Sequence, residues 1–98
     1  MSAQLTFHRL AEAELNDAAR YYENESKGLG LRFLDAVQQV ADAILEFPQG
    51  APVVRGSVRR RLVPGFPYGL LYSVKPDQVR VLAVMNLRRR PFYWLGRS

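Results

Sequence analysis

The residue periodicity of this chain changes at Phe47-Pro48, and this change limits the fold classes that are open to it. Before that point, apolar residues recur at steps of three and four, which is the spacing of one face of an α-helix. After it, short β-prone runs alternate with turns rich in proline and glycine. Because proline cannot continue a helix and restricts the residue before it, the helical part ends there. The chain therefore predicts helices first and a sheet second, within a single domain of residues 1–98.

The first half is typical of a short strand followed by a helical hairpin. A β-prone stretch at residues 4–7 precedes a helix that begins near Leu10, with His8 or Arg9 where its cap should be. Its acidic residues lie mostly opposite the apolar stripe: Glu12, Glu14, Asp17 and Glu23. Residues 26–30 break the pattern with two glycines, and a second apolar stripe then runs to Phe47. Two amphipathic helices with a short connection predict an αα-hairpin.

The second half predicts three strands, at residues 58–63, 68–74 and 79–87. The last two form a hairpin across residues 75–78, and the whole order is β-α-α-β-β-β. This order predicts an α+β fold, in which an antiparallel sheet carries the N-terminal helical hairpin on one face.

The last two predicted strands carry apolar residues on both sides, so both faces of the sheet should be at least partly covered. In the final strand, alternation puts Val81, Ala83 and Met85 on one face and Leu82 and Val84 on the other. The helical hairpin can cover one face of the sheet. The C-terminal segment is what remains for the other, and an apolar patch left open there would be a protein-binding site.

Charge is divided unequally along the chain. Residues 1–49 hold eight acidic and four basic residues, a net charge of −4, whereas residues 50–98 hold one acidic and ten basic residues, a net charge of +9. This asymmetry favours an anionic partner for the second half, either nucleic acid or an acidic protein. The alternative is that the two halves neutralise each other within the fold, although −4 cannot cancel +9.

Several classes of protein are disfavoured by what the sequence lacks. No run approaches the ~20 apolar residues of a membrane span, and the N-terminus has no signal-peptide pattern, so we expect a cytoplasmic protein with no membrane partner. With no cysteine and one histidine, His8, we expect no metal site, and His8 itself is expected to be a surface or capping residue. We expect no cofactor, because Gly28 and Gly30 do not belong to a phosphate-binding motif.

Arginines are the remaining functional candidates. One cluster, residues 59–61, lies on the first strand of the predicted sheet, and a second, residues 88–90, follows the last strand. Alternation along a strand puts Arg59 and Arg61 on one face and Arg60 on the other. Arginine suits phosphates and carboxylates because its planar fork donates two parallel hydrogen bonds. The neighbouring aromatics could add stacking surfaces or pack in the core: Phe92, Tyr93 and Trp94.

Taken together in their order, several motifs resemble the RelE/ParE superfamily of bacterial toxins. In the first half these are Ala11, Leu15, Ala18-Ala19 and Tyr21-Tyr22, then Gly28-Leu29-Gly30, Arg32-Phe33 and Phe47-Pro48. In the second half they are Val58-Arg59-Arg60, FPYGLLY at residues 66–72, RVLAV at residues 80–84, and Arg88-Arg89 with Pro91 and Trp94. The resemblance covers essentially the whole chain. It implies the β-α-α-β-β-β fold and a toxin neutralised by a ParD-like antitoxin with an acidic, amphipathic C-terminal segment, in a higher-order complex.

The superfamily has two branches with different targets: RelE-like members cut messenger RNA in the ribosome, and ParE-like members poison DNA gyrase. RNA cleavage through the 2′-hydroxyl needs a proton acceptor, a proton donor and cations for the phosphate. Where many relatives have a histidine and an Arg-Asp-Pro ending, this chain has Asn86 and Arg90-Pro91. Asn86 cannot carry protons, and Tyr93 could donate a proton but not readily accept one at neutral pH. These differences favour the ParE-like branch.

The resemblance and the charge pattern together give a set of expected site residues. With no catalytic residue expected, the target-binding set is Arg59, Arg60, Arg61, Arg88, Arg89, Arg90, Tyr93 and Trp94. The antitoxin should lie along the sheet and the helical hairpin, contacting those of Leu15, Tyr22, Phe33 and Val37 that are exposed. Two alternatives stay open. One is a ribosome-dependent endoribonuclease in which Arg60, Arg61 and Arg89 hold the phosphate and Tyr93 is the acid, and the other is a nucleic-acid-binding module without toxicity.

Overall fold

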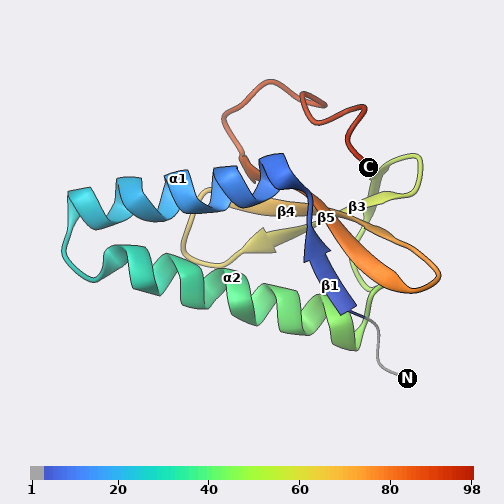
Figure 1. Cartoon of the computed structure of the whole chain (residues 1–98), viewed down its shortest axis with the longest axis horizontal. Coiled ribbons are helices and arrows are strands. Elements are labelled where there is room, and N and C mark those ends of the chain that lie inside the picture. Colours follow the sequence, from blue (N-terminus) through green and yellow to red (C-terminus); the bar gives the residue numbers. More distant parts are fainter. Residues whose placement is uncertain (1–3) are drawn as a thin grey trace.

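Two antiparallel helices lie across one face of a five-stranded sheet in the computed structural model, which describes residues 4–98 (Figure 1). The elements in chain order are β1 (Gln4–Phe7), α1 (Arg9–Glu25), α2 (Leu29–Glu46), β2 (Val53–Arg55), β3 (Val58–Val63), β4 (Tyr68–Val74) and β5 (Gln78–Asn86). The predicted α+β fold with a helical hairpin on the sheet is confirmed. Strand β2 was not predicted, because three residues are too few to show a period.

The sheet is mixed, with the strand order β1-β5-β4-β3-β2. The pairs β2–β3, β3–β4 and β4–β5 are antiparallel. Strand β1 pairs parallel with β5, with Gln4 opposite Gln78 and Phe7 opposite Val81. The prediction of a wholly antiparallel sheet is therefore wrong for β1. Parallel neighbours require a long connection, and here the helical hairpin and three strands provide it.

Local contacts explain where the two helices begin. The N–H of Leu10 donates to Nδ1 of His8 (3.0 Å), so His8 caps α1, which confirms its predicted capping role. Helix α2 begins at Leu29, inside the predicted break, after Gly28 turns the chain at φ +86°. At Gly30 the two helices approach so closely that a Cβ atom would lie 2.6 Å from the carbonyl oxygen of Ala19.

The core lies between the helices and the sheet. Helix α2 contributes Phe33, Val37 and Ile44, which are at most 3% exposed, and these pack with side chains of β4 and β5. The hydroxyl of Tyr72, within this core, donates to the carbonyl oxygen of Pro48 (2.7 Å) and so fixes the end of the helical part against the sheet. Among residues 4–98, no helix is long and apolar enough to cross a membrane.

A β-bulge in β5 changes which of its residues face the helices. Tyr72 pairs with Val81 but Leu71 pairs with Ala83, so Leu82 is an extra residue without a partner on β4. One extra residue reverses the alternation of side chains. As a result, Val81 and Val84 belong to the core under the helices, while Ala83 belongs to a separate cluster on the opposite face. The prediction that Val81, Ala83 and Met85 share one face is wrong for this reason.

Residues 87–98, here called the C-terminal segment, run outside the sheet beyond the end of β5 (Figure 1). Trp94 of this segment is 3% exposed and packs against Leu71, Ala83 and Met85 on the face that the helices leave open. The C-terminal segment, the one part of the chain that the sequence left available for the second face, does cover part of it. Coverage is partial, because Leu62 on the same face of β3 is 53% exposed.

Candidate functional site

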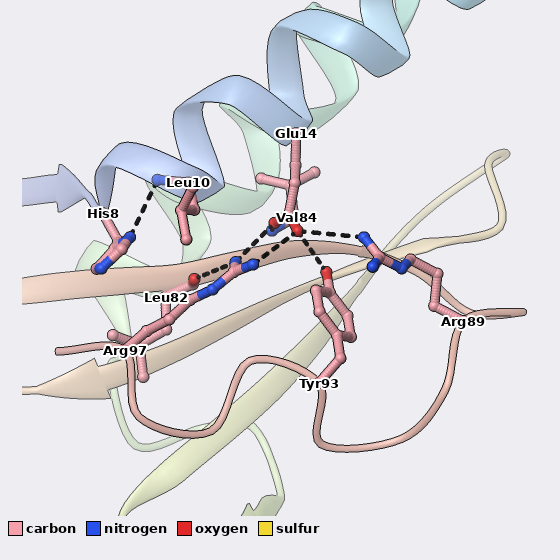
Figure 2. A network of polar contacts seen from close by, with 8 residues as sticks. All are labelled: His8, Leu10, Glu14, Leu82, Val84, Arg89, Tyr93 and Arg97. Carbon is pink, nitrogen blue, oxygen red and sulfur yellow. Dashed lines mark hydrogen bonds and ion pairs between the residues drawn. The ribbon is translucent and has the colours of Figure 1, made fainter.

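The carboxylate of Glu14 ties the C-terminal segment to helix α1 (Figure 2). The hydroxyl of Tyr93 donates to it at 2.8 Å, and the guanidinium of Arg97 donates to both of its oxygens at 3.0 and 3.2 Å. Arg89 forms an ion pair with the same carboxylate at 3.6 Å. The side chains of Glu14 and Arg97 are only 16% and 13% exposed, so this pair is largely shielded from water.

This tie forms where β5 has lost its neighbouring strand. Strand β1 pairs with β5 only as far as Val81, and beyond the bulge the edge of β5 turns polar backbone groups outward. The N–H of Val84 donates to Glu14 (3.0 Å), and the carbonyl oxygen of Leu82 accepts from Arg97 (3.0 Å). Two side chains thus satisfy backbone groups that a strand would otherwise have paired. The position of the C-terminal segment follows from the free edge of β5.

The tie also raises the pKa of Tyr93. Its ring lies between two arginines, with the guanidinium carbon of Arg89 3.9 Å and that of Arg97 5.1 Å from the ring centroid. Burial, the hydrogen bond to Glu14 and the charge of that carboxylate raise the pKa of the Tyr93 hydroxyl well above its ordinary value of 10.0. The Tyr93 hydroxyl, which donates to Glu14, therefore gives up its proton less readily than an ordinary tyrosine.

The second arginine cluster, Arg88 to Arg90, lies in the exposed turn after β5. The side-chain oxygen of Asn86 accepts from the N–H of Arg88 (2.9 Å), so Asn86 stabilises this turn. The side chain of Arg89 remains 54% exposed beside Tyr93 despite its ion pair with Glu14. This cluster is the part of the predicted target-binding set that the structure presents to solvent as one group.

The first cluster is divided between the two faces of the sheet, as alternation predicted. Arg59 pairs with Tyr72 and Arg61 with Leu70, both on the helix face, whereas Arg60 pairs with Leu71 on the other face. Arg59 donates to the carbonyl oxygen of Ala51 at 2.6 Å and so supports the connection between α2 and β2.

The two arginine clusters and the aromatics therefore do not form one surface. Of the first cluster, only Arg60 lies on the face that carries Trp94, which is itself buried. In the endoribonuclease alternative, Arg60 and Arg61 would bind the same phosphate. The structure does not bring them together, because they point to opposite faces of the sheet. The target-binding role of the remaining residues stays a prediction.

The residues expected to contact the antitoxin differ in accessibility. Phe33 is fully buried and Val37 is 3% exposed, because both lie on the face of α2 that packs on the sheet, so these two do not meet the condition of exposure. Leu15 and Tyr22 are partly buried at the edge of the core. Leu15 opens onto a groove of about 340 Å³ between β1 and the two helices, where it lies with Leu5.

Sequence reasoning missed the roles of Glu14 and Arg97. In the sequence, Glu14 is one of several acidic residues on the polar side of the first helix, and Arg97 is one of ten basic residues in the second half. No periodic pattern links two residues that are 83 positions apart. A weak signal was present in the unequal charges, because an acid in the negative half can partner a base in the positive half.

The helical hairpin on an open mixed sheet, followed by a basic segment, is consistent with the fold that the resemblance to the RelE/ParE superfamily implied. A family model described as "ParE toxin of type II toxin-antitoxin system, parDE" matches residues 5–91, and the chain belongs to this family. A solved structure of the chromosomal ParDE TA system from P. aeruginosa has a similar fold, with a TM-score of 0.73 and 19% identity over 87% of this chain and 96% of that one. A search of curated proteins found no match.

Proposed function

We propose that this ParE-family toxin inhibits DNA gyrase by binding to it, and that a cognate ParD-like antitoxin neutralises it in a higher-order complex. The exposed turn Arg88–Arg90 is the proposed target-binding surface, and Glu14 contacts both Arg89 of this turn and the nearby Tyr93. The acidic C-terminal segment of the antitoxin would complement the positive second half of the chain. Because gyrase acts on DNA in the cytoplasm, we place the toxin there as well.

The observation that carries the proposal is the hydrogen bond from Tyr93 to Glu14. In the endoribonuclease alternative, Tyr93 would have to give its proton to a leaving oxygen, but its raised pKa and its bond to a carboxylate oppose this transfer. Nor can His8 act readily as the base. Burial and the positive charge of Arg97 lower the pKa of His8, and its unprotonated Nδ1 already accepts from Leu10. The arrangement supports binding over catalysis.

Two assays with the purified protein separate the targets. We expect the toxin to inhibit DNA supercoiling by gyrase, and we expect primer extension on translated messenger RNA to show no new cuts. Cuts at codon positions combined with undisturbed supercoiling would overturn the proposal in favour of the endoribonuclease. Normal growth on induction without an antitoxin would favour a non-toxic nucleic-acid-binding relative.

A triple substitution tests the surface itself. Changing Arg88, Arg89 and Arg90 to Ser should abolish gyrase inhibition while the far-UV circular dichroism spectrum stays that of the wild type. A matched control removes the same charge from exposed positions of the helices, with Arg9, Arg20 and Arg32 changed to Ser. If both triple variants lose inhibition equally, the effect comes from net charge and the proposed surface is wrong.

A further inference from the structure

A cavity of about 280 Å³ lies between the sheet and the C-terminal segment, on the face away from the helices. We call it the Arg60 pocket. Its lining is apolar apart from one arginine. It comes from the four strands β2 to β5 and from the C-terminal segment: Val54, Arg60, Leu71, Met85, Pro91, Phe92 and Trp94. Among residues 4–98, no acidic residue lines it. Neither the tie at Glu14 nor the exposed turn Arg88–Arg90 uses this pocket.

Arg60 is held against the sheet, and its charge has no partner among the residues that the structure describes. It lies over Gly69, where an added Cβ atom would come within 3.2 Å of Cγ of Arg60, so the glycine makes room for the arginine stem. Within residues 4–98 the guanidinium of Arg60 makes no hydrogen bond or ion pair, although the residue is partly buried. A partly desolvated guanidinium of this kind binds a carboxylate with two parallel hydrogen bonds.

Phe92 forms a wall of the pocket in an unusual backbone conformation. Its φ is +63°, in the left-handed region that bulky residues rarely adopt. Its ring contacts Trp94 edge-on, with centroids 5.9 Å apart, and the guanidinium carbon of Arg55 lies 5.1 Å from its centroid. Strained residues that neighbours hold in place concentrate at binding sites. The aromatic wall is therefore formed before any partner arrives.

We propose that the Arg60 pocket anchors a protein partner by one apolar side chain whose neighbouring carboxylate binds Arg60. The partner is an acidic, amphipathic segment, and the assignment to the antitoxin rests on the proposed function above. The volume accommodates one leucine- or phenylalanine-sized side chain, and the basic, acid-free lining complements a carboxylate. A nucleobase fits less well, because its polar edges would be buried against apolar side chains with one arginine to satisfy them.

Trp94 makes the pocket directly observable, because it is the only tryptophan of the chain and lines the cavity. The probe is N-acetyl-L-phenylalanine, titrated into the full-length, ¹⁵N-labelled toxin while the indole N–H resonance of Trp94 is followed by NMR. The matched ligand control is N-acetyl-L-phenylalaninamide, which has the same ring but no charge. We expect saturable shifts of the Trp94 resonance with the acid, and binding about tenfold weaker with the amide.

Two variants assign the carboxylate contact. Arg60→Gln should remove the preference for the acid over the amide, whereas Arg61→Gln, which removes the same charge from the other face, should retain it. Equal binding of acid and amide to the wild type would overturn the proposal, as would equal effects of the two variants. Tighter binding of uridine monophosphate at Trp94 would overturn it in favour of a nucleic acid. A toxin that inhibits gyrase but shows no shift at Trp94 would keep the proposed function and refute this inference alone.

Discussion

Replacing Glu14 by Gln should detach the C-terminal segment from the domain. The amide keeps one acceptor oxygen but loses the charge that binds Arg97 and Arg89, and Arg97, 13% exposed, would be left with neutral acceptors only, among them the carbonyl oxygen of Leu82. Breaking a buried ion pair costs about 3–5 kcal/mol. Because the amide still accepts one bond and Arg89 is 54% exposed, we take the lower end, about 3 kcal/mol. This is a large share of the ~5–15 kcal/mol that stabilises a domain.

Urea and thermal unfolding measure this loss with two probes. Circular dichroism in the far ultraviolet follows the helices, and the fluorescence of Trp94 follows the C-terminal segment. At ~4–8 °C per kcal/mol for a domain of this size, Tm should fall by roughly 12 °C or more. The emission of Trp94 should shift to longer wavelength before the helical signal is lost, because the segment is released first.

The matched control is Asp17→Asn, on the same helix. Its ion pair with Arg20 spans 3.4 Å between side chains that are 75% and 72% exposed, so the loss should stay under ~0.5 kcal/mol. A loss of less than about 1 kcal/mol for Glu14→Gln, close to that of the control, would refute the reasoning that this carboxylate holds the segment. Coincident transitions of the two probes would contradict its separate release.

Three further outcomes follow from single contacts. Gly30→Ala should cost about 1–3 kcal/mol in urea unfolding, because its Cβ atom would collide with the carbonyl oxygen of Ala19, and an unchanged midpoint would contradict the tight helix crossing. Tyr72→Phe should lower the free energy of unfolding by about 1 kcal/mol through loss of the hydrogen bond to Pro48, measured by thermal melting. The raised pKa of Tyr93 contributes stability that is complete below about pH 10, the ordinary value for tyrosine, and is lost as the pH rises further. Tyr93→Phe should therefore flatten the decline of stability above about pH 10, and parallel declines would show that Tyr93 is not its source.

The fold was predictable because most of its helices and strands have recognisable local sequence patterns. The change of period at Phe47-Pro48 separated helices from strands, and the two glycines at the start of α2, Gly28 and Gly30, marked the turn of the hairpin. The parallel pairing of β1 was not accessible, because alternation shows that a stretch is a strand but not which way its neighbour runs. The bulge at Leu82 was equally hidden, since every residue from Val81 to Met85 is apolar and any register looks acceptable.

The candidate site was less predictable than the fold, because clustering in sequence is not clustering in space. Arg59 and Arg60 are neighbours in the chain but lie on opposite faces of the sheet, where Arg59 supports a loop and Arg60 lines a pocket. Conversely, Glu14 and Arg97 meet only because the end of β1 leaves an edge that both can reach. Contacts of this kind depend on tertiary geometry, which no local pattern encodes.

The 83-residue separation of Glu14 and Arg97 also has a kinetic consequence. Closing a flexible loop of that length costs about 4 kcal/mol of entropy. This cost becomes smaller once the hairpin and the sheet have formed and brought the two ends together. The tie should therefore close after the folding transition state. Substitutions at Glu14 should accelerate unfolding and leave the refolding rate nearly unchanged. The basic segment would then be the last part of the toxin to reach its place and the first to leave it.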